Sequence, residues 1–280
     1  MHVFFFNMKL CIIFFMLVWL PVTVVAQRGQ TPVREVALEG AVNFRDLGGY
    51  TTTDYRRIAM RRLYRAGDIS QLTDADMEEL KRRKIYTVVD FRGEGESVAA
   101  PDRLLPGTDY LSIPMGSGHV ADLATFVKKY ASGSDAMVAY YSDVSAFTEK
   151  YRPFFRKLLM LPDTSAMVFH CSAGKDRTGI AAALLLYAFD VPMETILADY
   201  AATNLHRRNE NEKMIDCLAN EHGVDRKTAI EIMDANPFYL ESTFNALKRQ
   251  YGSVDSFLYK ELGMTEAAKL RLREKFLNNL

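Results

Sequence analysis

The sequence is poor in the residues that mark several specialised classes of protein. It holds three cysteines and one tryptophan in 280 residues, and its 35 basic side chains equal its 35 acidic ones. Three cysteines are too few for a disulfide scaffold, and a net charge of zero does not indicate nucleic acid as a partner. No internal repeat or low-complexity linker is present. With 49% hydrophobic and 25% charged residues, the chain has the composition of a folded globular protein.

The first 26 residues have the features of a secretory signal. Lys9 precedes an uncharged apolar run over 10–20, and small residues follow at the cleavage position. A retained membrane helix is the alternative, but the run is shorter than the roughly 20 apolar residues that a span requires. We therefore expect a signal peptide at 1–26 and a secreted or periplasmic protein, with either Met1 or Met8 as the initiator.

The rest of the chain alternates apolar runs of strand length with helix patterns. Short β-branched runs predict strands near 36–38 and 57–66 and at 85–91, 109–115 and 166–170. Capping signals and apolar spacing predict helices at 73–84, at 120–131, at 135–161 with a break near Pro153, and over most of the chain after Pro192. This order predicts an α/β sheet followed by a helical C-terminal part. We expect a loose tail at 27–40 and a single domain at 41–280.

One segment, HCSAGKDRTG at 170–179, carries residues suited to binding an anion. The predicted strand at 166–170 delivers Cys171 to the carboxyl end of the sheet, and five residues separate it from Arg177 at the start of a predicted helix. Small residues at 172–174 allow backbone N–H groups to turn inward, and a helix N-terminus completes a site for a tetrahedral dianion. Arg177 can donate two hydrogen bonds to phosphate oxygens.

The same positive environment acts on the thiol of Cys171. Thiols beside cations and helix N-termini ionise readily. We therefore expect a thiolate that attacks phosphorus in line and forms a thiophosphoryl enzyme, which water then cleaves. The loop amides and Arg177 would hold the charge of the transferred oxygens. Thr178 is placed to donate a hydrogen bond to the sulfur, and His170 is expected to orient the loop.

The segment at 170–179 resembles the signature loop of the cysteine-dependent protein tyrosine phosphatase superfamily. Further blocks are similar to the bacterial secreted tyrosine phosphatases related to mycobacterial phosphatase B: NFRDLGGY at 43–50, LYRAG at 63–67, DFR at 90–92, and Asp199-Tyr200 with Thr203-Asn204. The resemblance implies the tyrosine-phosphatase-like α/β fold, a central mostly parallel sheet flanked by helices. It also implies hydrolysis of phosphotyrosine, with phosphoserine, phosphothreonine or phosphoinositides sometimes accepted.

The proton donor for the leaving group stays open between two aspartates. Many members of the superfamily carry this acid on a Trp-Pro-Asp loop, but the single tryptophan, Trp19, lies in the predicted signal peptide. Asp176 lies inside the loop, and the resemblance implies acid–base work for it. Asp90 ends a predicted strand and would face the crevice at the same sheet edge. The alternative role for Asp90 is a salt bridge that positions Arg177.

We expect the substrate phosphate to be bound by the loop and two further side chains: Ser172, Ala173, Gly174, Lys175, His170 and Arg45. Lys175 adds a second cation, which extends the substrates to phosphoinositides. Arg45 either contacts phosphate directly or braces the loop with Asp46. The remaining histidines lack metal-ligand spacing, so we expect neither a metal nor another cofactor. The expected partner is a phosphorylated protein or a phosphoinositide and not a nucleic acid, and the sequence does not indicate an oligomeric state.

Two alternatives to a tyrosine phosphatase stay open. The first is a phosphoinositide phosphatase that uses the same loop. The second is a catalytically inactive phosphate-binding module, although Cys171, Asp176 and Arg177 are all present. Cys217 lies on a predicted amphipathic helix, and we expect it to be too far from Cys171 to form a disulfide.

Overall fold

The computed structural model describes residue 2 and residues 33–116 and 120–278. One compact unit extends from Pro32 to Leu280. The predicted signal peptide therefore lies outside the described residues apart from residue 2, and so do residues 27–32 of the predicted tail.

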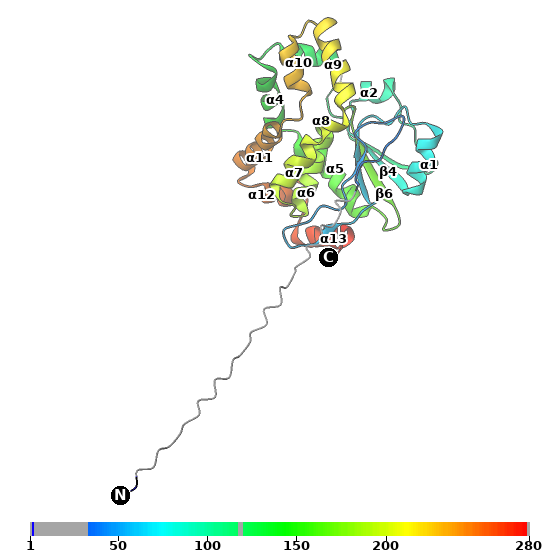
Figure 1. The fold of residues 1–280 in the computed structure, drawn as a ribbon, viewed down its shortest axis with the longest axis vertical. Helices are drawn as coiled ribbons and strands as arrows, with labels where there is room; N and C mark the ends of the chain where they lie inside the picture. Colours follow the sequence, from blue (N-terminus) through cyan, green and yellow to red (C-terminus); the bar gives the residue numbers. More distant parts are fainter. Residues whose placement is uncertain (1, 3–32, 117–119, 279–280) are drawn as a thin grey trace. The chain divides into compact units, whose positions relative to one another are not determined.

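A five-stranded sheet forms the centre of this unit (Figure 1). Its spatial order is β1 (Arg45–Asp46), β3 (Leu63–Ala66), β6 (Ala166–His170), β4 (Ile85–Asp90) and β5 (Asp109–Ser112). The last four strands are parallel to one another, and β1 is an antiparallel edge strand. The predicted α/β fold with a mostly parallel sheet is confirmed. A separate pair joins β2 (Arg57–Ile58) to β7 (Leu277–Asn278).

Both faces of the sheet are buried, and β6 shows how. Ala166 and Val168 belong to one apolar cluster, which also contains Leu80 of α1 (Asp74–Arg82). Met167 and Phe169 belong to a larger cluster on the other face. That second cluster includes α5 (Phe147–Met160) and α6 (Arg177–Ala188). Because neither face meets water, β6 is apolar from Ala166 to Phe169, and this run predicts a buried strand.

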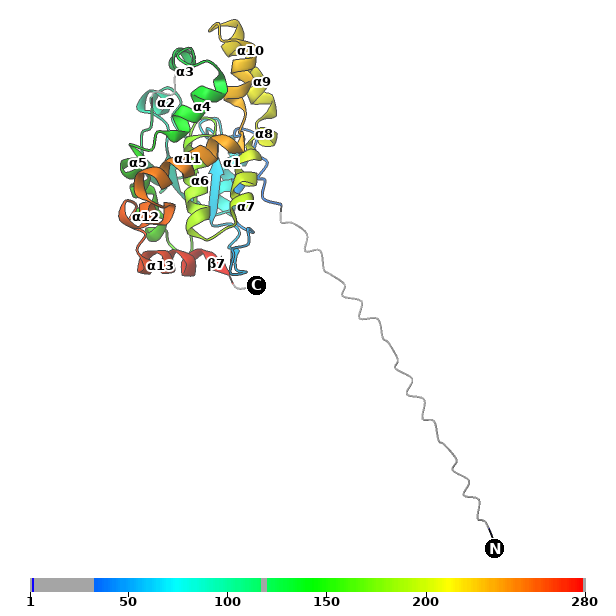
Figure 2. The same cartoon turned by 90° about the vertical axis from the view of Figure 1, so that its left-hand side faces the viewer.

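The part of the chain after β6 is helical, as predicted. Its helices are α6, α7 (Met193–Ala201), α8 (Thr203–His206), α9 (Arg208–Asn220), α10 (Arg226–Met233), α11 (Pro237–Tyr251), α12 (Val254–Lys260) and α13 (Glu266–Phe276). Two of them, α10 and α11, pack against α4 (Gly133–Ser142), which comes from the middle of the chain (Figure 2). The other helices before β6 are α2 (Glu94–Ala99) and α3 (Val120–Val127).

The helix predicted over 135–161 is in fact two helices, and the predicted break near Pro153 is wrong. Pro153 lies inside α5, where it removes one backbone donor without ending the helix. The chain breaks earlier, where Asp143 caps the end of α4 and accepts a hydrogen bond from the Ser145 amide at 3.2 Å. Such side-chain-to-backbone bonds compete with continued helix.

The loose tail predicted at 27–40 is wrong for its last residues. Glu35 forms a β-bridge with Arg45, and Val36 is buried. The amides of Glu39 and Gly40 donate to the Asp76 carboxylate at 2.9 and 2.8 Å. Residues 35–40 are therefore part of the folded unit.

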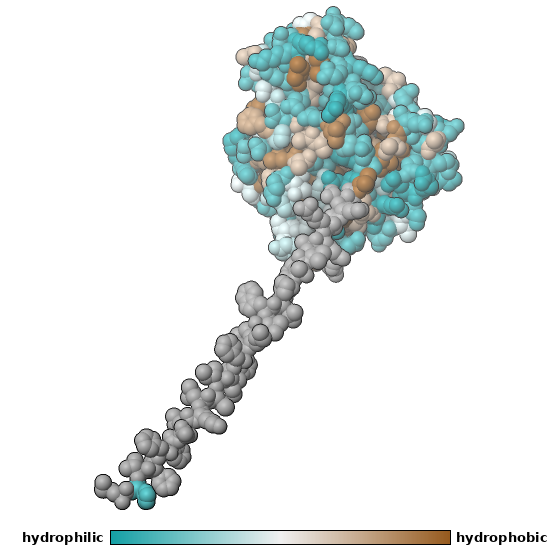
Figure 3. Space-filling view, in the orientation of Figure 1, coloured by the Kyte–Doolittle hydropathy of each residue, from teal (hydrophilic) through white to brown (hydrophobic). Residues whose placement is uncertain are grey.

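The surface is polar over most of the face drawn in Figure 3, with separate small apolar patches. Scattered patches of this kind are normal on a soluble surface and mark no interface by themselves. Within the described part of the chain, no helix combines the length and the apolar character needed to cross a bilayer.

Candidate active site

The loop between β6 and α6 gathers the predicted loop residues into one place. Cys171 directly follows β6, its side chain is 1% exposed, and Arg177 is the first residue of α6. Gly174 has a φ of +66°, and a Cβ there would lie 2.4 Å from the carbonyl oxygen of Ala66. Only glycine suits this position, which packs the loop tightly against β3.

The carbonyl groups of the loop are held away from its interior. Asn43 Nδ2 donates to the carbonyl oxygens of Ala173 and Gly174, both at 3.1 Å. Arg65 Nη2 donates to the same Gly174 oxygen at 2.7 Å. Because N–H and C=O point in opposite directions across a trans peptide, these bonds turn the amides of Gly174 and Lys175 to the other side. The donors that face the interior of the loop are therefore backbone N–H groups.

A buried ion network stands behind these donors. Asp199 of α7 binds Arg65 Nη1 at 2.5 Å and Arg45 Nε at 3.2 Å, and it accepts a bond from the Tyr50 hydroxyl at 3.0 Å. Burial acts to raise the pKa of Asp199, but Arg45 and Arg65 outweigh it and hold that pKa well below the usual range. The network fixes Arg65, and Arg65 in turn fixes the loop.

Arg45 does not contact the phosphate site, so that part of its prediction is wrong. It is 2% exposed, and its guanidinium donates to Asp199, Thr203 and Asn43. Its predicted pairing with Asp46 is also absent, since Asp46 accepts from the amides of Gly48 and Arg61. Arg45 supports the loop only through Asp199 and Asn43.

Glu96 of α2 contacts Arg177 directly, and no sequence pattern pointed to it. Arg177 Nη1 lies 2.5 Å from Glu96 Oε2, and Nη2 donates to Oε1 at 3.0 Å. Nη1 also donates to the Phe91 and Met115 carbonyls, and Ser172 donates to Glu96 Oε1. Burial acts to raise the pKa of Glu96, but Arg177 and Ser172 outweigh it and hold that pKa below its usual value.

This contact leaves one edge of Arg177 available. Glu96 takes the end of the guanidinium, where Nη1 and Nη2 lie side by side. Among the described residues, Nε has no hydrogen-bond partner and Nη2 donates only to Glu96. Nε and Nη2 form the lateral edge, and two parallel N–H groups there match two oxygens of a phosphate.

Asp176 lies beside the loop with one carboxylate oxygen engaged. Its Oδ1 accepts a hydrogen bond from the Tyr141 hydroxyl at 2.7 Å, and Lys175 Nζ is 2.7 Å from the same oxygen. The ammonium of Lys175 is buried, and its angles are not those of a hydrogen bond. The Asp176 side chain is 25% exposed, so this carboxyl can exchange protons with a bound molecule or with water.

The surroundings of Asp90 do not suit the proton donor that the sequence allows it to be. Its carboxylate accepts bonds from Arg92 Nη2 at 2.9 Å and from the Tyr110 hydroxyl at 3.0 Å. Burial acts to raise the pKa of Asp90, but His170 and Arg92 outweigh it and hold that pKa below its usual value. An ionised carboxylate paired in this way is no proton donor, and its cation is Arg92 and not Arg177.

Two further predictions about the loop fail. Thr178 Oγ1 is buried without a hydrogen-bond partner among the described residues, so it makes no bond to the sulfur. His170 Nε2 is 3.0 Å from Asp102 Oδ2, and within the same part of the chain Nδ1 has no partner, so its ring bonds Asp102 and not the loop. Cys171 and Cys217 are both free thiols, as predicted.

Asp90, Asp102 and His170 have ligand atoms close enough together to share a metal ion. Arg92 already binds both carboxylates, through Nη2 at 2.9 Å to Asp90 and at 2.6 Å to Asp102. A cation added there would face this guanidinium, so the cluster does not suit a metal.

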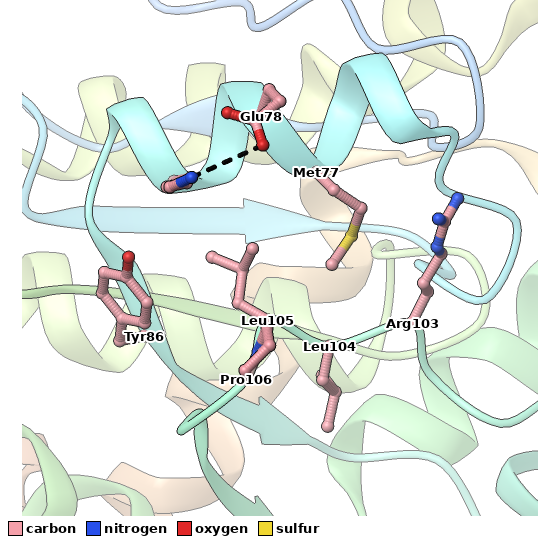
Figure 4. Close-up of a pocket in the computed structure, with 8 residues that line it drawn as sticks. Met77, Glu78, Tyr86, Arg103, Leu104, Leu105 and Pro106 are labelled. Atoms are coloured by element: carbon pink, nitrogen blue, oxygen red, sulfur yellow. Dashed lines mark ion pairs between the residues drawn. The ribbon is translucent and has the colours of Figure 1, made fainter.

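The surface depression in Figure 4 is a different place. It lies between α1 and the segment 103–106, and Met77, Tyr86 and Leu105 line it. None of its lining residues belongs to the loop at 170–178.

Comparison with known proteins agrees with this geometry. A family model described as "Tyrosine phosphatase family" matches residues 36–278. A putative tyrosine-protein phosphatase of Cupriavidus necator is 32% identical over 241 residues, which is 85% of this chain and 87% of that protein. The triple specificity protein phosphatase PtpB of Mycobacterium tuberculosis is 27% identical over 281 residues, covering 86% and 98%. A crystal structure of P. aeruginosa TpbA aligns with a TM-score of 0.32 and 18% identity over 64% of this chain and 89% of that one, a likeness too weak to bear on function.

Proposed function

The chain belongs to the tyrosine phosphatase family, and we propose that it hydrolyses phosphotyrosine, and also phosphoserine and phosphothreonine monoesters, through a thiophosphoryl intermediate on Cys171. The observation that carries this proposal is the loop itself. A cysteine lies at its base, its carbonyls are tied outward, and Arg177 presents an unused lateral edge beside it.

In the first step, the loop amides and the Nε–Nη2 edge of Arg177 hold the three terminal oxygens of the phosphate. The Cys171 thiolate attacks phosphorus in line, a P–S bond forms, and the P–O bond to the leaving phenol breaks. Asp176 gives its proton to that phenolate oxygen. In the second step, Asp176 takes a proton from water, the water oxygen bonds to phosphorus, and the P–S bond breaks to return the thiolate.

Replacing Asp176 with asparagine should slow substrates with poor leaving groups most. We expect kcat for phenyl phosphate to fall by about 10²-fold or more, because the phenolate then leaves unprotonated. Activated aryl phosphates, whose leaving groups need no proton, should lose much less. The measurement is a series of aryl phosphates of graded leaving-group acidity. Asp90→Asn is the matched control: it should lower stability and leave the leaving-group dependence as in the wild type. A steeper dependence in Asp90→Asn alone would assign the acid to Asp90.

Replacing Glu96 with glutamine should weaken phosphate binding. The variant keeps the shape of the side chain but removes the charge that orients Arg177. Hydrogen bonds to charged groups contribute about 1.5–3 kcal/mol, so kcat/KM should fall by roughly tenfold or more. Competitive inhibition by inorganic phosphate measures the effect directly. Glu94→Gln, in the first turn of the same helix, is the control and should behave as the wild type. An unchanged inhibition constant in Glu96→Gln would show that Arg177 does not depend on Glu96.

Phosphoinositides are the second candidate substrate class, and Lys175 favours them. Its ammonium is buried and forms an ion pair with Asp176 Oδ1 at 2.7 Å, but among the described residues it has no acceptor with hydrogen-bond geometry. A second phosphate on an inositol ring would provide one. A panel that compares phosphotyrosine peptides with soluble phosphoinositides, for the wild type and for Lys175→Met, separates the two classes. A loss of activity in Lys175→Met that is confined to the phosphoinositides would support phosphoinositides as substrates.

We also propose that the protein acts outside the cytoplasm. The support is the signal-like pattern at 1–26, with its basic residue, apolar run and small residues at the cleavage position. Cell fractionation with N-terminal sequencing of the mature protein tests this. Recovery of the uncleaved chain from the cytoplasm would contradict it.

A further inference from the structure

We propose that Tyr141 is a positioning residue that holds Oδ1 of Asp176, so that the transferable proton resides on Oδ2. This inference rests on the proposed function, in which Asp176 is the general acid. Tyr141 lies in α4, 35 residues before Asp176, and no motif in the sequence includes it.

The geometry around Tyr141 is that of a hydrogen-bonded chain. Its side chain is fully buried, with 0% exposure. Its hydroxyl donates to Asp176 Oδ1 at 2.7 Å and lies 2.7 Å from the hydroxyl of Tyr200 in α7. Tyr200 is buried as well. A hydroxyl has one proton to donate. When that proton goes to Asp176, the Tyr200 hydroxyl must be the donor to Tyr141.

The hydroxyls of Tyr141 and Tyr200 both stay protonated at neutral pH. Burial, and next the charge of Asp176, raise the pKa of Tyr141 well above its ordinary value. Burial and the same carboxylate raise the pKa of Tyr200 in the same way. Tyr141 therefore keeps, at neutral pH, the proton that it donates to Oδ1.

A fixed donor on one oxygen has a chemical consequence. A protonated carboxyl has one hydroxyl oxygen and one carbonyl oxygen, and the carbonyl oxygen remains an acceptor. With Tyr141 donating to Oδ1, and Lys175 Nζ 2.7 Å from it, Oδ1 is the acceptor in both protonation states. Oδ2 has no hydrogen-bond partner among the described residues, so it carries the proton toward the leaving group. The carboxyl group of Asp176 is thus already oriented for proton transfer before the substrate binds.

Tyr141 also has a packing role, which the test must separate from positioning. Its ring contacts those of Tyr200 and Tyr239 at centroid distances of 6.0 and 6.1 Å. Tyr141→Phe retains these ring contacts and removes only the hydroxyl. Tyr239→Phe is the matched control, because it also removes one buried hydroxyl, which donates to the Glu231 carbonyl at 3.0 Å and does not contact Asp176.

The experiment measures kcat and KM for the aryl phosphate series in the wild type, Tyr141→Phe, Tyr239→Phe, Asp176→Asn and the double variant Tyr141→Phe/Asp176→Asn. We expect Tyr141→Phe to lower kcat for phenyl phosphate by about tenfold and to leave activated substrates and KM nearly unchanged. In the Asp176→Asn background, the same substitution should have almost no further effect, because both changes act on one proton transfer.

Each failure has its own signature. If Tyr141→Phe slows all substrates equally, or behaves as Tyr239→Phe, the hydroxyl has only a structural role and the inference is wrong. If the fold-decrease in kcat of the double variant equals the product of the two single decreases, Tyr141 does not act through Asp176. If Asp176→Asn has the same leaving-group dependence as the wild type, Asp176 is not the acid and the inference about Tyr141 is wrong. If the wild type is inactive, the proposed function itself fails, whatever Tyr141 does.

Discussion

Replacing Cys171 with serine is expected to abolish turnover of phosphotyrosine while phosphate binding persists. Removal of a catalytic nucleophile typically costs about 10⁴-fold or more in kcat. Serine has nearly the same size and leaves the loop amides and Arg177 in place, so the binding site should survive. Steady-state kinetics measure the first effect, and calorimetric titration with a phosphotyrosine peptide measures the second.

The same experiment decides between the enzyme and the inactive module. Cys217→Ser is the control, because Cys217 is a free thiol in α9 outside the loop, and it should retain full activity. Turnover in Cys171→Ser equal to that of the wild type would exclude a covalent mechanism. A wild type that binds the peptide as tightly as Cys171→Ser and never cleaves it would establish a phosphate-binding module instead.

Replacing Asp199 with asparagine should cause the largest loss of stability. The substitution keeps the shape of the side chain but leaves Arg45 and Arg65 buried without a counter-charge. Removing one partner of a buried ion pair costs about 3–5 kcal/mol, which corresponds to a fall in Tm of roughly 10 °C for a domain of this size. Thermal unfolding measures it. Activity should fall as well, since Arg65 holds the Gly174 carbonyl.

Asp163 provides the matched control on the surface. It also lies near two cations, Lys275 at 3.0 Å and Arg62 at 4.0 Å, but its side chain is 80% exposed. Exposed pairs contribute little, so Asp163→Asn should leave the Tm unchanged. Equal effects of the two substitutions would mean that the Asp199 network is not what stabilises the domain.

The pH dependence of stability follows from the same carboxylate. The folded pKa of Asp199 lies below the ordinary carboxyl value of 3.8, so its contribution is complete above that value and is lost as the pH falls through the folded pKa. The wild type should therefore lose stability on acidification below about pH 4. In Asp199→Asn, the loss of stability that comes from protonation of Asp199 should be absent. Identical acid unfolding curves, once offset for the lower starting stability, would contradict it.

The part of the site that is contiguous in the chain could be predicted from the sequence, because it depends on neighbouring residues only. The strand, the loop and the helix N-terminus follow one another within 166–188, so residue types and spacing suffice to place Cys171 and Arg177. The buried strands were equally clear, because both faces of the sheet are covered and the apolar runs are continuous.

The polar partners could not be predicted because they depend on tertiary contacts. Glu96 and Tyr141 belong to helices with ordinary patterns, and only the fold brings them to Arg177 and Asp176. Asp90 stays open as a candidate acid at the level of sequence for the same reason. A carboxylate at the end of a strand is a reasonable acid until Arg92, two residues later, turns back to neutralise it.

The hydrogen bond from Asn43 to the loop has a consequence for how the protein becomes active. Asn43 lies 130 residues before the carbonyl that it holds. A chain in which Asn43 is cut off from the loop, or is not yet packed against it, can hold Cys171 and Arg177 without the hydrogen bonds that turn the loop carbonyls outward. We therefore expect the oxyanion cradle to form only once these two distant segments have packed together.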